Sequence, residues 1–216
     1  MDTLLLFLIN KQWINPALDR LMAICSNFDL WRPFLLVGAL ILFWRGGFRW
    51  RSFLIVLLIT LAFTDGIVTQ ITKIAVNRPR PIQALADVRE VTLQKTQPTF
   101  LGLFQPVNVR LSPTPVGRIQ VGRSFPSGHA MNNTAIATLA ILFFRWWGAL
   151  YIIPAALISY SRIYCGSHWP TDIIVSVVLG VGFALLSFAL LSILYRKVAG
   201  RWFPRLYAKH PQLGAP

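Results

Sequence analysis

Long apolar stretches, separated by short polar or basic segments, dominate this chain. Five of them approach or exceed the roughly 20 apolar residues that a helix needs to cross a bilayer. The pattern therefore predicts an all-α fold, a polytopic transmembrane helical bundle that forms one integral membrane domain over residues 1–216. The predicted spans cover residues 30–44, 53–76, 130–147, 149–164 and 171–195.

Residues 1–28 fit a further span poorly, because Lys11, Asp19 and neighbouring polar side chains make burial in lipid costly. Leu18 and Met22 belong to an apolar stripe at helical spacing. We therefore expect an amphipathic helix that lies in the membrane interface, and a six-span bundle is the alternative.

The distribution of charge orients the predicted spans. The chain carries 21 Lys and Arg against seven Asp and Glu, a net charge of +14. In a soluble protein this excess would suggest a nucleic-acid partner, but in a membrane protein basic connections mark the cytoplasmic side, so no nucleic acid is expected. Three regions carry cations and no acid, and are predicted to be cytoplasmic: residues 45–51, the turn at Arg145 and the tail 196–216.

Residues 82–125 form the one long connection, and the same orientation places it outside the cytoplasm. Prolines recur in it and no hydrophobic period is sustained, so a loop is predicted. Its apolar run 100–104 either dips into the membrane interface or packs in a small local core. The loop is also basic, which either draws an anionic headgroup towards the site or reflects charges that translocation tolerates. Its cations are Arg89, Lys95, Arg110, Arg118 and Arg123.

Three motifs at the extracytoplasmic ends of the spans carry the candidate chemistry. Lys73 and Arg80 form K-x6-R-P after the second span, and Arg162 follows Ser161 at the end of the fourth. Arginine binds phosphate oxygens through two parallel hydrogen bonds and lysine adds a point charge, so the three cations can form a phosphate cradle. Alone, Lys73 would more often be a lysine that snorkels from a helix end, but Arg80 and Arg162 are predicted on the same face.

Ser127, Gly128 and His129 open the third predicted span. Glycine lets backbone N–H groups approach an oxyanion, and the N-terminus of a helix favours negative charge. The Ser127 hydroxyl can donate a further hydrogen bond. An ordinary N-cap turn is the alternative.

His168 and Asp172 lie four residues apart at the start of the fifth span, a spacing that puts both side chains on one helical face. An aspartate that accepts the proton of one ring nitrogen leaves the other nitrogen as an aimed nucleophile, which favours His168 over His129 as the attacking group. A purely structural pair is the alternative. Metal binding fits less well, because one His–Asp pair among several cations is a poor cation site. Cys25 and Cys165 lack metal-ligand spacing, and a disulfide between them stays open.

Asp65 lies inside the second predicted span, four and eight residues before Thr69 and Lys73 on one helical stripe. A carboxylate within the membrane suggests a functional role. We expect Asp65 and Ser161 to support the residues that bind the phosphate without touching the phosphate themselves. Asp65 would do so by pairing with or orienting the cations of the site. A structural hydrogen bond to a neighbouring helix is the alternative for Asp65.

Together these motifs resemble the signature of the type 2 phosphatidic acid phosphatase superfamily, with every signature position present between Lys73 and Asp172. The resemblance implies a helical membrane phosphatase that needs no metal or other cofactor and forms a phosphohistidine. It implies that His168 is the nucleophile, that Asp172 orients it, and that His129 protonates the leaving group. The residues it implies for holding the phosphate are Lys73, Arg80, Ser127, Gly128 and Arg162.

The expected function is hydrolysis of a lipid phosphate monoester or diphosphate at the outer face of a bacterial inner membrane, so the partners are the bilayer and an anionic lipid phosphate. Candidate substrates are undecaprenyl diphosphate, phosphatidylglycerophosphate, phosphatidic acid and lipid A 1-phosphate. A vanadium-dependent haloperoxidase is an alternative that the dense apolar spans disfavour. A non-enzymatic protein that binds anionic lipid is another, disfavoured by the intact His129, His168 and Asp172.

Overall fold

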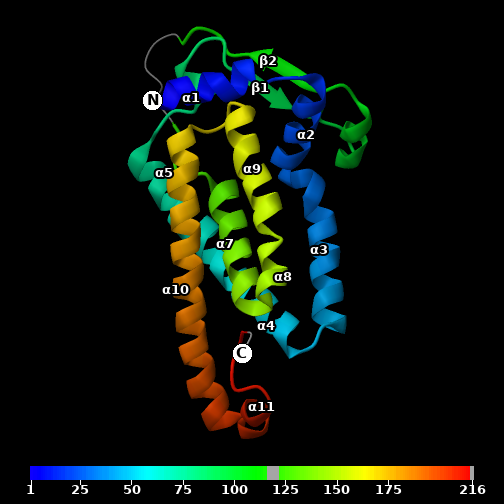
Figure 1. Ribbon diagram of the computed structural model, residues 1–216, viewed down its shortest axis with the longest axis vertical. Helices are drawn as coiled ribbons and strands as arrows, with labels where there is room; N and C mark the ends of the chain where they lie inside the picture. The colour runs from blue at the N-terminus through cyan, green and yellow to red at the C-terminus, as the bar shows by residue number, and fades with distance from the viewer. Residues whose placement is uncertain (116–121, 215–216) are drawn as a thin grey trace.

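The computed structural model describes residues 1–115 and 122–214 and is mostly helical, as Figure 1 shows. Arg118 of the predicted basic loop and the last two residues of the predicted tail lie outside the described residues. The α-helices are α1 (Asp2–Phe7), α2 (Pro16–Ser26), α3 (Phe28–Arg45), α4 (Phe48–Phe63), α5 (Gln70–Val76), α6 (Pro81–Ala84), α7 (Gly128–Phe144), α8 (Trp146–Ala149), α9 (Ile152–Tyr164), α10 (Pro170–Trp202) and α11 (Pro204–Lys209).

The bundle is built around α7 and α10, which make its most extensive helix contact, with α4 and α9 packed beside them. Gly180 of α10 allows this approach, because a Cβ atom there would lie 2.5 Å from the Met131 carbonyl oxygen of α7. Further along the two helices from this contact, buried side chains of α4, α7 and α10 form one core that includes Phe53, Phe143 and Ala184. The bundle thus holds the first turns of α7 and α10 side by side, and these turns carry two of the predicted motifs.

Two helical stretches of the described residues, 48–84 and 170–202, are each long and apolar enough to cross a membrane. A third candidate is the pair α2 and α3, which meets the same criterion as one span bent by 54°. The helices α7 and α9 have 17 and 13 residues and fall short on length alone. The helical fold is therefore confirmed, whereas the count of five spans stays a prediction.

The N-terminal segment is built differently from the single amphipathic helix that was predicted. It contains α1, a π-helical turn at Leu8–Gln12, and α2. Figure 1 shows α1 lying across the end of the bundle above α10. Leu6 and Asn10 are fully buried, and Asn10 donates hydrogen bonds to the Arg89 and Tyr164 carbonyl oxygens. These contacts fix the segment to the end of the bundle where the motifs lie.

The predicted loop 82–125 contains a small sheet that the sequence analysis missed. Strands β1 (Arg89–Thr92) and β2 (Asn108–Leu111) pair antiparallel, with Arg89 opposite Leu111. Val91 and Leu93 are buried against α2 and Tyr164, so part of the loop does form a local core. The apolar run at 100–104 is a 3-10 helix in which Leu103 packs on this core while Phe104 stays 76% exposed.

Two smaller expectations are also answered. Cys25 and Cys165 are free thiols in the structure. The last helix does not end near residue 195, because α10 continues to Trp202 and is followed by α11. At 33 residues α10 is about 50 Å long, longer than the roughly 30 Å hydrocarbon core of a bilayer.

Candidate active site

The three motifs come together at one end of the bundle, the end that carries α1 and the sheet in Figure 1. The elements that meet there are the end of α5, the start of α7, the end of α9 and the start of α10. The charges of Lys73, Arg80 and Arg162 lie close enough to act on one another and on His129, and His168 also lies close enough to act on His129. Residues that are far apart in the sequence therefore form one site.

His168 is buried, and its ring is oriented by the backbone. Its Nδ1 lies 2.6 Å from the Ser124 carbonyl oxygen and 3.8 Å from Oδ2 of Asp172. Because a carbonyl oxygen can only accept, Nδ1 must carry the proton, and Nε2 then keeps its lone pair. Gly166 permits the turn before it, with φ at +69°, a conformation that other residues rarely adopt. The geometry leaves Nε2 as a neutral nitrogen free to attack.

Asp172 has no exposed side-chain surface and binds several groups at once. Its carboxylate accepts hydrogen bonds from the Ser124 hydroxyl, from the Trp169 backbone N–H at 3.1 Å, and from Arg78 Nη1 at 2.5 Å. Asp172 therefore acts on His168 in two ways. It lies near the ring itself, and it holds Ser124, whose carbonyl oxygen is the closer partner of Nδ1.

Arg78 connects this carboxylate to the N-terminus of the chain. Its second terminal nitrogen, Nη2, lies 2.6 Å from Oδ2 of Asp2, and its guanidinium stacks over the Trp169 ring at 5.1 Å. Asp2 also accepts from the Thr171 N–H and hydroxyl. Burial raises the pKa of Asp2, but these hydrogen bonds and Arg78 outweigh it and hold the pKa below its ordinary value. The result is a chain of charges, Asp2 to Arg78 to Asp172, that ends beside the candidate nucleophile.

Ser127, Gly128 and His129 form the first turn of α7. Ser127 is fully buried and is the N-cap residue, with its hydroxyl accepting from the Ala130 N–H and its own N–H donating to the Ser176 hydroxyl at 2.8 Å. The Ser127 hydroxyl proton remains able to donate to a bound anion. The His129 ring meets Phe28 edge-on, with ring centres 6.3 Å apart. This arrangement combines a helix N-terminus, a hydroxyl and an imidazole on the side of the three cations.

Arg162 is oriented by the N-terminal segment. Its Nη1 donates to both the carbonyl oxygen and the hydroxyl of Ser26, the last residue of α2. Its Nε is buried without a hydrogen-bond partner, and so is Nε2 of His129. Buried polar atoms are normally paired, so unpaired donors of this kind, gathered beside further cations, fit an anionic ligand.

Asp65 and Ser161 occupy different surroundings. Ser161 is fully buried and its hydroxyl donates to the Ile158 carbonyl oxygen, a contact within its own helix. Asp65 lies in a π-helical turn at Thr64–Thr69, and a Cβ on Gly128 would lie 3.0 Å from its Oδ1. The π turn adds a residue to the helix, and Thr69 is buried while Asp65 is exposed. The Asp65 charge nevertheless lies close enough to act on Lys73. Asp65 thus borders the start of α7, and its role stays a prediction.

Several residues of the site were not anticipated from the sequence. They are Asp2, Ser26, Arg78 and Ser124. The last three each contact a predicted site residue, whereas Asp2 contacts Arg78. Arg78 and Ser124 lie within a few residues of the predicted motifs, yet nothing in their spacing distinguishes them from ordinary loop residues. Within residues 1–115 and 122–214, no group of three or more His, Cys, Asp or Glu side chains gathers in a way that could hold a metal ion.

A bundle of apolar helices with a buried, oriented histidine beside a cluster of cations is typical of proteins that bind phosphate groups. Residues 52–196 match the family model of the PAP2 superfamily, a range that includes all three motifs. The chain belongs to the PAP2 superfamily, and the resemblance seen in its motifs is confirmed.

Two curated relatives carry names of lipid phosphatases. The chain is 46% identical to an undecaprenyl-diphosphatase of Sulfolobus acidocaldarius over 65 residues, which are 30% of this chain and 32% of that protein. It is 25% identical to a lipid A 4'-phosphatase of Bacteroides thetaiotaomicron over 185 residues, 83% of this chain and 72% of that protein. The first match thus spans only about a third of the relative's length.

A solved structure supports the fold. The crystal structure of Aquifex aeolicus LpxE superposes with a TM-score of 0.57 at 23% identity, over 86% of this chain and 93% of that one. At this identity the likeness shows the fold alone.

Proposed function

We propose that this protein hydrolyses the phosphate monoester or diphosphate of a membrane lipid through a phosphohistidine formed on His168. The observation that carries the proposal is the geometry of this ring. Its Nδ1 proton is committed to the Ser124 carbonyl oxygen, which leaves Nε2 free, and the charges of Arg162 and Arg80 act on the ring, with Lys73 close to both of these cations. A neutral aimed nitrogen beside unpaired cationic donors is what attack on a phosphate ester needs.

In the first step, the Nε2 lone pair of His168 attacks phosphorus, and the bond from phosphorus to the lipid oxygen breaks. His129, which gains a proton as the anionic phosphate binds beside it, gives that proton to the departing oxygen. The three cations, the N-terminus of α7 and Ser127 stabilise the charge on the remaining phosphoryl oxygens. The ring becomes positive as its nitrogen bonds to phosphorus, and the nearby Asp172 carboxylate, held by Arg78, stabilises that charge.

In the second step, water attacks the phosphohistidine. His129, now without its proton, takes a proton from the water, and the bond between phosphorus and Nε2 breaks. Inorganic phosphate leaves and His168 regains its neutral form. This sequence uses only side chains of the protein, with cations in the place that a metal would take in other phosphatases, and so we propose a metal-independent reaction.

The proposed substrate is a lipid whose phosphate lies at the membrane surface while its tail stays in the bilayer. The relatives named as undecaprenyl and lipid A phosphatases support this class. Undecaprenyl diphosphate, phosphatidylglycerophosphate, phosphatidic acid and lipid A 1-phosphate are the candidates. We further propose an inner-membrane location with the site facing the periplasm or exterior, because the basic segments 45–51 and 196–216 favour the cytoplasmic side.

Detergent-purified protein is expected to release phosphate from at least one of these four lipids, and to do so at the same rate with an excess of EDTA. The physical reason is that Lys73, Arg80 and Arg162 supply the positive charge. A colorimetric phosphate assay over the four lipids measures this directly. Loss of all activity with EDTA, restored by a divalent cation, would contradict the metal-free mechanism and leave the lipid assignment intact.

The rate of hydrolysis should also stay high to an unusually low pH before it falls. Burial lowers the pKa of His168 to about 4, although the nearby Asp172 carboxylate pulls it upwards. Because the neutral ring is the nucleophile, activity should be present above pH 4 and fall as the pH drops through that value, where the ring gains its second proton. The measurement is kcat/KM from pH 3.5 to 7 with two substrates of different phosphate pKa. A limb near pH 6.5 with both substrates would contradict the assignment.

A further inference from the structure

The end of the bundle opposite the active site is strongly basic. It is built from the α3–α4 turn, the end of α7, and the chain from about residue 188 onwards, and none of the seven acidic residues lies in these segments. In Figure 1 this is the end that carries α11 and the C-terminus. Its cations are Arg45, Arg49, Arg51, Arg145, Arg196, Lys197, Arg201, Arg205 and Lys209.

The last described residues are not a loose basic tail, because residues 210–214 fold back against this end. The His210 ring stacks on Phe48 with ring centres 4.3 Å apart and planes within 8°. The Tyr195 hydroxyl donates to the His210 carbonyl oxygen at 2.6 Å. Leu213 packs against the core shared by α4, α7 and α10. The segment therefore forms a wall between α4 and α10.

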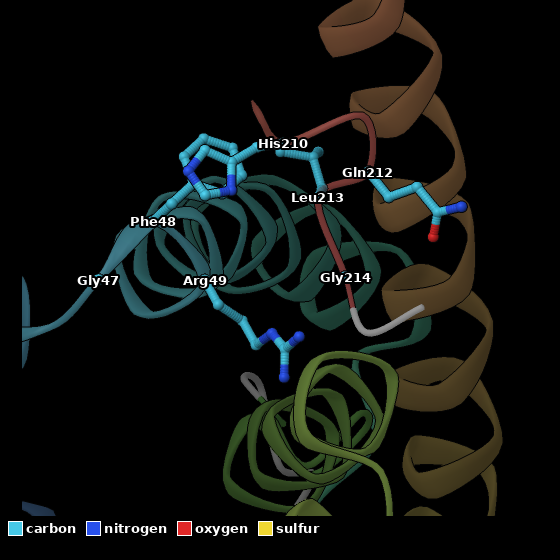
Figure 2. A pocket seen from close by; sticks show the side chains of 7 residues that line it. All are labelled: Gly47, Phe48, Arg49, His210, Gln212, Leu213 and Gly214. Atoms are coloured by element: carbon cyan, nitrogen blue, oxygen red, sulfur yellow. The ribbon is translucent and has the colours of Figure 1, made fainter. Parts of the chain in front are cut away.

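Two cavities flank this wall, and both are lined by Gln212, Leu213 and Gly214. The first has a volume of about 280 Å³ and is also lined by Arg49 and His210, as Figure 2 shows. The second has a volume of about 380 Å³ and lies along α10, where its lining includes Arg196. In Figure 2 the Arg49 side chain extends from α4, whereas the Gln212 side chain extends from the C-terminal segment over the α10 ribbon.

The polar groups of these cavities have capacity for a ligand. Across residues 1–115 and 122–214, neither Arg49 nor Arg196 has a carboxylate partner. Ser192 lines the second cavity one turn before Arg196, and its hydroxyl is buried without a hydrogen-bond partner. Only four buried side-chain polar atoms in the described residues lack a partner, and the other three belong to Thr69, His129 and Arg162 near the active site. Phe188 and Ile193 give the second cavity an apolar side.

Exposed tryptophans indicate the level at which this end meets the membrane. Trp44, Trp146, Trp147 and Trp202 are 63–85% exposed, and all lie at the same end of the bundle as Arg49 and Arg196. Tryptophan is enriched at the membrane–water interface, where lipid headgroups lie. The cavities are therefore expected at the depth of headgroup phosphates.

We propose that these paired cavities form a binding site for an anionic glycerophospholipid of the leaflet opposite the active site. The Arg196 guanidinium and the Ser192 hydroxyl donate to the phosphodiester in the second cavity, and Arg49 donates to a headgroup oxygen from the first cavity, across the C-terminal segment. The apolar side formed by Phe188 and Ile193 accommodates the beginning of an acyl chain. Basic pockets between membrane helices on the cytoplasmic side recognise anionic headgroups by the same chemistry.

The test is titration of the purified full chain with phosphatidylglycerol, followed by native mass spectrometry and thermal unfolding, with saturating inorganic phosphate present to fill the active site. Phosphatidylglycerol is a phosphodiester and is not a substrate of the proposed reaction. It should bind and raise the unfolding temperature, whereas phosphatidylcholine should not. Arg49→Gln with Arg196→Gln should weaken the binding at least about tenfold, as expected for the loss of two charged hydrogen-bond donors.

The matched control is Arg205→Gln with Lys209→Gln, which removes the same charge from the same end without altering the cavity lining. This control should bind phosphatidylglycerol as the unmodified protein does. An equal loss of binding in both double variants would show a diffuse electrostatic attraction and would overturn the proposed site. No loss of binding in either variant would also overturn it. If the Arg49 and Arg196 variant instead lost binding of inorganic phosphate alone, the cavities would be a free-phosphate site and the lipid assignment would be wrong.

Discussion

Replacement of His168 by alanine is expected to lower phosphate release by about 10⁴-fold or more, because the reaction then has no aimed nitrogen to bond to phosphorus. No covalent phosphoenzyme should form. The measurement is phosphate release together with acid-stabilised trapping of the phosphoprotein from a ³²P-labelled lipid. Full activity in this variant would contradict the nucleophile assignment.

Two other histidines serve as matched comparisons. His210 lies at the opposite end of the bundle, stacked on Phe48, so His210→Ala should keep its activity. His129→Ala should lose activity with a lipid alkoxide as leaving group, which needs a proton, and lose less with an activated phenolate leaving group. With the phenolate, phosphohistidine should accumulate in His129→Ala, because water attack lacks its base. The same rescue in His168→Ala would mean that the two roles are reversed.

Replacement of Arg78 by alanine is expected to lower both stability and activity, since it leaves the Asp172 carboxylate buried without a cation. The Asp172 side chain is fully buried and lies 2.5 Å from Arg78. Removal of one partner of a fully buried pair costs roughly 3–5 kcal/mol. The cost here should be smaller, because Arg78 is 31% exposed and water can reach the position it leaves. The free energy of unfolding in mixed micelles and the rate of phosphate release measure the two effects. Arg78→Lys should recover part of both, because it keeps the charge but loses the second hydrogen bond.

The controls separate a positioning role from a loss of folding. Asp2→Asn weakens only the outer end of the chain of charges, where Asp2 is 20% exposed, so its effect should be much smaller. In the Arg78→Ala background, Asp172→Asn should restore stability, because the uncompensated charge is gone, while activity stays low. A cost in Arg78→Ala no larger than that in Asp2→Asn would contradict the proposed link.

The boundaries of the helices were well predicted where apolar runs are long. The first span was expected at 30–44 and α3 covers Phe28–Arg45. The second was expected at 53–76, and the helix there is continuous except for its π-helical turn. The hairpin in the loop was missed because its strands have four residues each, too few to establish a period of two. The anchored C-terminal segment was missed for a different reason, since the ring on which His210 stacks belongs to Phe48, far away in the sequence.

By itself, the sequence determined the class of fold, the family and the residues whose chemistry suits a phosphate. Hydrophobicity and charge act locally, and motif spacings are visible without coordinates. Only the tertiary structure decided which groups hold the candidate nucleophile. The proton of His168 goes to the carbonyl oxygen of Ser124, and Asp172 is held by Arg78, which is held by Asp2 at the N-terminus. These partners are backbone atoms or residues from distant segments, and their proximity follows from how α1, α7 and α10 pack, which no local pattern contains.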